Sequence, residues 1–262
     1  MLVVLAYLIV IVPLALVFRE WWWYFQINAW ERRRQSSLII LSYYLRQKTR
    51  NIARRGRILD DDSKNAFLGW YEQHDPKQTL DVILHSSGGC VAVSDTVLRC
   101  LLAHKGQVNI FVPRYAWSAG TMTALCGHNL YMNPFATLSP VDPLMTVDLN
   151  KEEENVHTYA YVDLATLIER KKKQSQVDDT LLIAEIELKK VYDDTLRIVR
   201  EILAKRHPYL HSKEADQIVQ HLASAKTHHH ETNFSVSFLQ SLGLRVLDPV
   251  PKLLQRIFVS CF

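Results

Sequence analysis

The sequence predicts an α/β protein, built on a parallel sheet of βαβ units and preceded by one N-terminal transmembrane helix. Two apolar runs, residues 80–84 and 108–112, each end in a loop of small or turn-forming residues. Each loop leads into apolar residues at helical spacing. This alternation of strand, loop and helix indicates a parallel sheet, in which sites form beyond the carboxyl ends of the strands.

The transmembrane helix is predicted from residues 1–18, which carry no charge. About 20 apolar residues cross a bilayer as a helix, and the aromatic cluster at residues 21–25 extends the run to that length. A cleaved signal peptide would need a basic start and a small-residue cleavage site, which are not clearly present. A buried core helix is the other alternative. Basic residues follow the run and none precede it, so the positive-inside rule predicts a single-pass protein with the rest of the chain in the cytoplasm.

Three segments are expected: a membrane anchor at residues 1–25, a basic juxtamembrane linker at 26–57 and one domain at 58–257. Contact with anionic lipid headgroups and a plain solvated linker fit the basic run equally well. The 262 residues are 48% hydrophobic, which suffices for one sizeable core. The net charge of +4 is small and scattered, so a nucleic-acid partner is not expected.

The remaining elements follow from capping residues and apolar spacing. Asp60, Asp61 and Asp62 precede aromatic residues at helical spacing, which predicts a capped helix before the first strand. The long helix predicted at 178–204 exceeds what one core face needs, so part of it is expected to serve a subunit interface. The other predicted elements are a strand at 129–132, a returning loop at 133–143, a strand and helix over 156–168, and a short helix and strand over 234–248.

The two loops carry the candidate chemistry. Ser118 is predicted at the first turn of a helix, where free backbone N–H groups favour a developing negative charge. Gly88 and Gly89 would let backbone N–H groups approach a ligand closely and form an oxyanion hole. Each feature alone has a simpler interpretation, since a Gly-Gly pair is usually a turn and a Ser at a helix start is usually an N-cap.

Taken together, three blocks of sequence resemble a known superfamily. Residues 84–89 (LHSSGG), 112–121 (VPRYAWSAGT) and 138–143 (LSPVDP) occur in the order and spacing of the Clp protease/crotonase superfamily. Within it, the chain is most similar to the serine dehydrogenase proteinase family, which is related to serine peptidases of the signal peptide peptidase A type. The resemblance continues through His230 and residues 242–244.

The resemblance implies roles for particular residues. Ser118 would be the nucleophile, and Gly88, Gly89 and the N–H near Ala119 would hold the oxyanion. The loop that carries Asp142 would line the substrate cleft, and His230 would approach that cleft. Because Clp-type folds often form rings, a homo-oligomer is expected.

The general base is harder to assign. Clp peptidases have a His about 25 residues after the nucleophile, but the loop that reads Ser139 to Asp142 here contains none. The signal peptide peptidase relatives use a downstream Lys, which directs attention to Lys173 and to Lys189 on the long helix. A solvated basic run and the polar face of a helix are the alternative interpretations of these lysines.

The predicted function is that of a membrane-anchored serine endopeptidase acting on a peptide or protein substrate, without a cofactor. A catalytically silent scaffold at the membrane is one alternative. An amino-acid lyase is another, but Gly88 and Gly89 alone are too little to cradle the phosphate of pyridoxal phosphate. His228, His229 and His230 are consecutive, so their side chains point apart and no metal site is expected.

Overall fold

The structure is a computed structural model that describes residues 22, 25–42, 61–89, 91–148, 156–173, 177, 179–223, 228–230, 232–247 and 249–260. The predicted membrane anchor, residues 1–25, lies outside this part of the chain except for Trp22 and Phe25. None of the helices within it has the length and apolar character needed to cross a bilayer.

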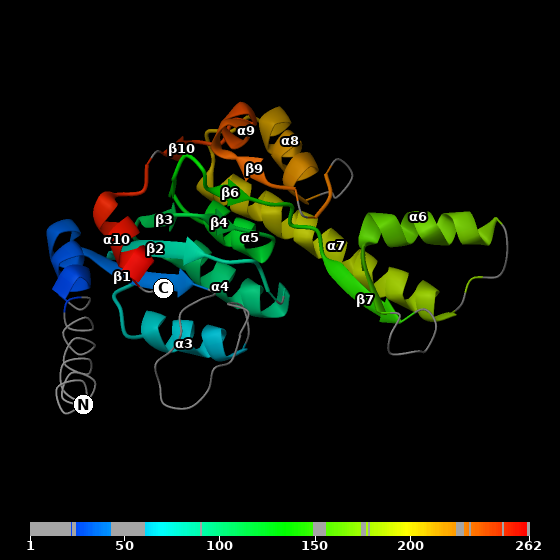
Figure 1. Cartoon of the computed structure of the whole chain (residues 1–262), viewed down its shortest axis with the longest axis horizontal. Helices are drawn as coiled ribbons and strands as arrows, with labels where there is room; N and C mark the ends of the chain where they lie inside the picture. The colour runs from blue at the N-terminus through cyan, green and yellow to red at the C-terminus, as the bar shows by residue number, and fades with distance from the viewer. Residues whose placement is uncertain are drawn as a thin grey trace, which may run out of the picture.

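A five-stranded parallel sheet forms the centre of the protein (Figure 1). The strands predicted at 80–84, 108–112 and 129–132 are confirmed. In sheet order, the strands are β1 (Ser36–Ser42), β2 (Thr79–His85), β3 (Val108–Val112), β5 (Asn129–Met132) and β10 (Val246–Leu247).

Strand β1 lies in the segment that was expected to be a linker. It pairs with β2 along its whole length, from Ser36 opposite Thr79 to Ser42 opposite His85. Leu38 and Ile39 point to opposite faces of the sheet and both are buried. The sheet therefore takes in residues on the N-terminal side of the expected domain boundary, because their apolar side chains have a core to enter on each face.

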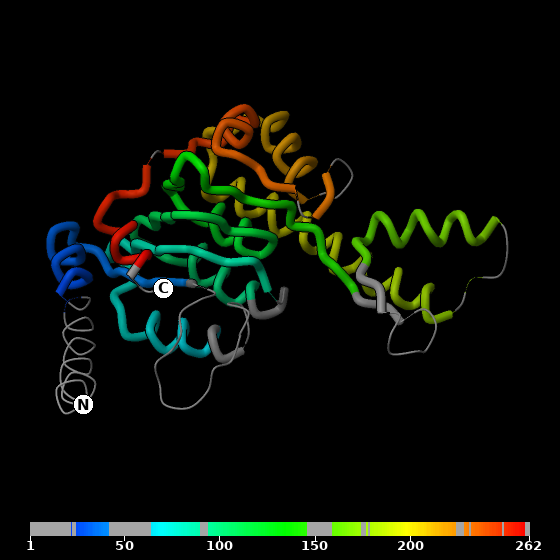
Figure 2. The backbone as a smooth tube through the Cα atoms, viewed as in Figure 1, coloured from blue at the N-terminus to red at the C-terminus, as the bar shows by residue number. Residues whose placement is uncertain are grey.

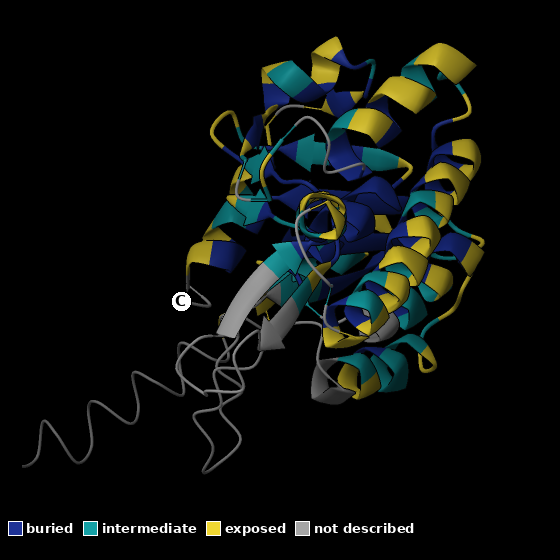
Figure 3. Ribbon diagram, turned by 90° about the vertical axis from the view of Figure 1, so that its right-hand side faces the viewer, coloured by how far each residue is buried: buried dark blue, intermediate teal, exposed yellow. Residues whose placement is uncertain are grey.

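Helices cover both faces of the sheet, so the central strands are buried on both sides, as is usual for parallel sheets. Figure 3 shows buried residues concentrated in these strands. Leu80, Val82 and Leu84 of β2 belong to the larger core. The helices that contribute to this core are α3 (Asp61–Tyr71), α4 (Val91–Ala103), α5 (Ala119–Leu125), α7 (Asp179–Arg206), α8 (Ser212–Ala223) and α9 (Val236–Ser241).

The other face is covered by two segments from opposite ends of the sequence. A helix at residues 25–34 and α10 (Lys252–Ser260) pack side by side over this face, as Figure 2 shows in blue and red. Trp30 from the first and Phe258 from the second join Ile83 and Phe111 of the sheet in one apolar cluster. The two ends of the chain are thus parts of the same core.

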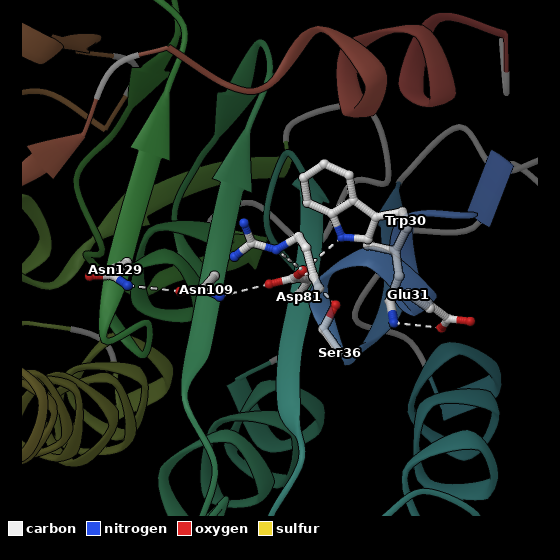
Figure 4. Close-up of polar contacts among 8 residues, drawn as sticks. Trp30, Glu31, Ser36, Asp81, Asn109 and Asn129 are labelled. Carbon is white, nitrogen blue, oxygen red and sulfur yellow. Dashed lines mark hydrogen bonds and ion pairs between the residues drawn. The ribbon is translucent and has the colours of Figure 1, made fainter. Parts of the chain in front are cut away.

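A buried carboxylate joins the helix at 25–34 to the sheet (Figure 4). Asp81 of β2 is fully buried, and both of its carboxylate oxygens accept hydrogen bonds. Asn109 Oδ1 in turn accepts a hydrogen bond from Asn129 Nδ2 of β5, which extends the network across the sheet. The donors to Asp81 are Trp30 Nε1 at 2.7 Å, Arg34 Nε at 3.0 Å, Ser36 Oγ at 2.8 Å and Asn109 Nδ2 at 2.7 Å. Such a set of partners offsets the cost of burying a charge.

An arm extends from the main body (Figure 1). It has its own small cluster of apolar side chains, among them Leu164, Ile168 and Leu188. The arm consists of β7 (Leu144–Asp148), β8 (Val156–Ala160), α6 (Tyr161–Lys172) and the first part of α7. The strand and helix predicted over 156–168 and the long helix predicted at 178–204 are confirmed.

A group of imidazoles surrounds one buried arginine where α7 meets the sheet. Arg206 is buried, donates to the carbonyl oxygen of Leu101 and contacts the ring of His128. Burial lowers the pKa of His104, His128 and His207, and the positive charge of Arg206 lowers the pKa of each further. These imidazoles are therefore held neutral in the folded chain.

We expect the stability of the protein to fall as the pH drops below about 6.5, the ordinary pKa of histidine. Below that pH the imidazoles of the unfolded chain bind protons, whereas the buried imidazoles of the folded chain stay neutral until a lower pH is reached. Their contribution to the free energy of unfolding is therefore present above that pH and is lost as the pH falls below it. Urea unfolding between pH 8 and pH 5 measures the effect. His207→Gln should flatten the dependence, whereas His211→Gln, at an exposed position, should not. If the free energy of unfolding of His207→Gln depends on pH as steeply as that of the intact chain, His207 is not one of the groups that cause the dependence.

Candidate active site

A second, small sheet assembles the candidate site. Its strands are β4 (Tyr115–Ala116), β6 (Thr137–Leu138) and β9 (Phe234–Ser235), in the order β4-β6-β9. A bridge between Ser86 and Ala116 joins β4 to the end of β2. This arrangement brings four segments together at the carboxyl end of the central sheet. Three of them follow β2, β4 and β6, and the fourth precedes β9.

Ser118 lies in a sharp turn between β4 and α5. Its backbone has φ 52° and ψ −120°, a combination that is uncommon and strained for a residue with a side chain. Its N–H donates to Ser139 Oγ at 2.9 Å. Ser118 occupies the N-cap position of α5, yet its side chain makes no capping hydrogen bond. The simpler N-cap interpretation therefore does not account for this serine.

Gly88 lies directly against Ser118. Its φ is +102°, and a Cβ added there would be 2.9 Å from Ser118 Cβ and 3.3 Å from Ser118 Oγ. A side chain at Gly88 would therefore collide with the turn that carries the serine. The N–H of Gly88 already donates to Ser86 Oγ at 3.0 Å, so it is less available to a ligand than predicted.

Two further N–H groups lie beside this turn. Ala119 is the first residue of α5, a position with no acceptor inside the helix. Among the residues that the structure describes, the N–H of Ala119 donates no hydrogen bond, whereas Gly89 takes part in a β-bridge. Of the three predicted oxyanion donors, Ala119 therefore best meets the requirement for an N–H without an acceptor in the described part of the chain.

Asp142 and His230 form a hydrogen-bonded pair that the sequence did not predict. His230 Nδ1 is 2.6 Å from Asp142 Oδ1, and Asp142 is buried while His230 is partly exposed. The residues are 88 positions apart in sequence, and the antiparallel pairing of β6 with β9 brings them together. Asp142 comes four residues after Leu138, and His230 four residues before Phe234, its partner in the register.

The pairing fixes the orientation of the imidazole. A carboxylate at Nδ1 selects the tautomer whose Nε2 accepts a proton, which is the form needed by a general base. Among the described residues, Nε2 of His230 has no hydrogen-bond partner. The sequence analysis had named both residues as cleft residues only; the signal that could have paired them was the presence of a His and an Asp beside predicted cleft loops.

The two candidate lysines lie on the arm. Lys173 is exposed at the C-cap of α6. Lys189 on α7 is also exposed, and its Nζ is 2.6 Å from Asp193 Oδ2. The hydrogen bond that Lys189 donates to Asp193 raises the pKa of Lys189, which favours the protonated form rather than the neutral amine that a base requires. Among the described residues, no hydrogen bond or ion pair joins Ser118 Oγ to Lys173, Lys189 or His230.

The three consecutive histidines diverge. His228 Nε2 lies 2.9 Å from Nδ1 of His221, whereas His230 contacts Asp142 and His229 is exposed. Over the described residues, no cluster of three or more potential metal ligands is found.

Comparison with known proteins identifies a family for this chain. A family model described as ClpP-like SDH-type serine proteinase matches residues 27–258. Two proteins of Methanocaldococcus jannaschii, named uncharacterized protein MJ0137 and uncharacterized protein MJ1495, are each 28% identical over 173 residues, 66% of this chain. Those residues make up 55% and 53% of the two relatives, so the chain spans about half their length.

The chain is also similar to the solved structure of a mutant of the 1510-N membrane-bound stomatin-specific protease. The TM-score of this match is 0.45 and the sequence identity is 14%. The match covers 75% of this chain and 76% of that one.

Proposed function

The chain belongs to the ClpP-like SDH-type serine proteinase family, and we propose that it hydrolyses peptide bonds of a protein substrate with Ser118 as the nucleophile. The observation that carries this proposal is the strained turn at Ser118, whose Oγ is left out of helix capping. Strain of this kind persists only where the surrounding structure holds it, and it is concentrated at functional sites.

The proposed oxyanion donors are the N–H groups of Gly89 and Ala119. A tetrahedral intermediate formed on Ser118 Oγ places its negative oxygen within reach of backbone N–H groups that flank the serine. Gly88 supports this arrangement by its lack of a side chain, since a Cβ there would fill the space next to Ser118 Oγ. Gly88 therefore leaves room for the oxyanion hole, while its own N–H donates a hydrogen bond to Ser86 Oγ.

We propose His230, oriented by Asp142, as the general base. The support is the 2.6 Å contact of the pair and the strand order β4-β6-β9, which sets the segments of Ser118, Asp142 and His230 side by side. His230 would take the proton of Ser118 during attack and return it to the leaving amine, while Asp142 stabilises the imidazolium. Lys173 and Lys189 are the competing bases, supported by the resemblance to peptidases that use Lys.

Three further parts of the function are proposals that rest on the sequence. A single-pass anchor at residues 1–25 would hold the peptidase at a membrane, with membrane lipid as a partner and the catalytic domain in the cytoplasm. A homo-oligomer is proposed from the resemblance to ring-forming Clp peptidases.

The base is tested by reaction with a fluorescent fluorophosphonate, which labels activated serines. We expect the rate of labelling to fall about 10³-fold or more in His230→Gln and in Asp142→Asn, because a serine without an oriented base is a weak nucleophile. Lys173→Met and Lys189→Met are the matched variants and should keep the rate of the intact chain.

The opposite pattern, with labelling lost in one lysine variant and kept in His230→Gln, would replace this base with that lysine. An intact, folded chain that does not label at all would favour the alternative of a catalytically silent scaffold.

A further inference from the structure

Ser139 is bound to the turn of Ser118 by three polar contacts. The residue is buried and comes directly after β6. Its Oγ accepts the N–H of Ser118 at 2.9 Å. Its own N–H donates to Thr121 Oγ1 at 3.1 Å, and its carbonyl oxygen accepts from the same Thr121 hydroxyl at 2.9 Å. Among the described residues of the loop at 139–143, only Ser139 hydrogen-bonds both to Ser118 and to the first turn of α5.

The hydroxyl of Ser139 is oriented as an acceptor. It donates its hydrogen to the carbonyl oxygen of Pro140 at 3.2 Å, which leaves a lone pair directed at the N–H of Ser118. A backbone with φ 52° is unfavourable for serine unless its surroundings compensate. The bond to Ser139 supplies one such compensation at the strained residue itself.

We infer that Ser139 is a positioning residue, whose hydroxyl holds the backbone of Ser118 in the strained form that presents Oγ for reaction. This inference rests on the proposed function, since it assigns how the proposed nucleophile is kept in place. Ser139 does not touch the reacting atoms and acts through the N–H of Ser118 alone.

The same residue connects the nucleophile to its proposed base. Asp142 follows Ser139 by three residues, and the intervening Val141 is fixed by a hydrogen bond from its N–H to the carbonyl oxygen of Leu222 in α8. The segment from Ser139 to Asp142 is therefore held at both ends, at one by the turn of Ser118 and at the other by α8 and His230. A shift of Ser139 would change the separation between nucleophile and base.

The test compares Ser139→Ala with Ser139→Thr and with a matched control. Thr195→Val also removes one buried hydroxyl, whose hydrogen bond to the carbonyl oxygen of Val191 stays within α7. The rate of fluorophosphonate labelling reports the nucleophile without requiring a bound peptide, and the thermal unfolding midpoint reports the fold. Both are measured on the full chain.

We expect Ser139→Ala to lower the labelling rate about 10²-fold, because a small displacement of a reacting group costs about that much. Thr195→Val should keep the labelling rate, and Ser139→Thr, which retains the hydroxyl, should recover most of it. For peptide hydrolysis, the loss in Ser139→Ala should appear in kcat rather than in KM.

Three results overturn the inference, and they can be told apart. If the intact chain labels and Ser139→Ala labels equally fast, Ser139 does not position the nucleophile, while the proposed function stands. If the intact, folded chain does not label, the proposed function and this inference both fail. A parallel fall in labelling rate and unfolding midpoint that Thr195→Val reproduces would reduce Ser139 to a structural residue.

Discussion

Replacing Ser118 with alanine is expected to abolish fluorophosphonate labelling and to lower the rate of peptide hydrolysis by about 10⁴ to 10⁶-fold. The reason is that Oγ is the atom that would form the acyl intermediate, and the hydroxyl bonded to the N–H of Ser118 is not free to replace it. Ser139 Oγ, the nearest hydroxyl by hydrogen bonding, is buried and already joined to Pro140 and to the N–H of Ser118.

Ser118→Ala should leave the fold intact. Alanine keeps the Cβ that lies against Gly88, and the removed Oγ makes no hydrogen bond with the described residues. We therefore expect the thermal unfolding midpoint of the variant to match that of the intact chain. Hydrolysis that survives in Ser118→Ala at the rate of the intact chain would rule out this serine as the nucleophile, whatever the labelling shows.

Replacing Asp81 with alanine is expected to lower the free energy of unfolding by about 3–5 kcal/mol, as removal of one partner from a buried charge network does. The change would leave the indole N–H of Trp30, the hydroxyl of Ser36 and the amide of Asn109 without their acceptor. Arg34 is partly exposed, so its guanidinium can turn to water and contributes less.

Urea unfolding of Asp81→Ala and of two comparison variants measures this effect. Asp81→Asn keeps the size of the side chain and one acceptor oxygen, so its loss should be smaller. Asp216→Ala changes an exposed position on α8 and should stay within about 0.5 kcal/mol of the intact chain. A loss in Asp81→Ala no larger than in Asp216→Ala would mean that the network adds nothing to stability.

The central strands could be predicted because short, largely apolar segments followed by loops mark strands of a buried sheet. Residues 80–84, 108–112 and 129–132 are such segments, each with one polar residue (Asp81, Asn109 or Asn129), and the structure follows them within a residue. Strand β1 was not predicted, because the apolar residues 38–41 lie in a segment with many basic residues, and that composition indicated a linker. Only the pairing of β1 with β2 makes it part of the sheet.

The candidate site divides in the same way. The position of Ser118 at the start of a helix and of Gly88 in a loop could be predicted, because short motifs encode local backbone geometry. The contact of Asp142 with His230 could not, because it depends on the register between β6 and β9, each only two residues long. Strands this short carry no periodic pattern, so nothing in the sequence indicates which residues face each other.

The hydrogen bonds of Asp81 have a mechanical consequence. They fasten the helix at residues 25–34 to the beginning of β2, and the end of β2 leads through Ser86 to Gly88. Force applied to the start of that helix would therefore be transmitted along β2 to the loop of Gly88, which lies against Ser118. Any load carried by this helix would therefore reach the segment that lies against the proposed nucleophile.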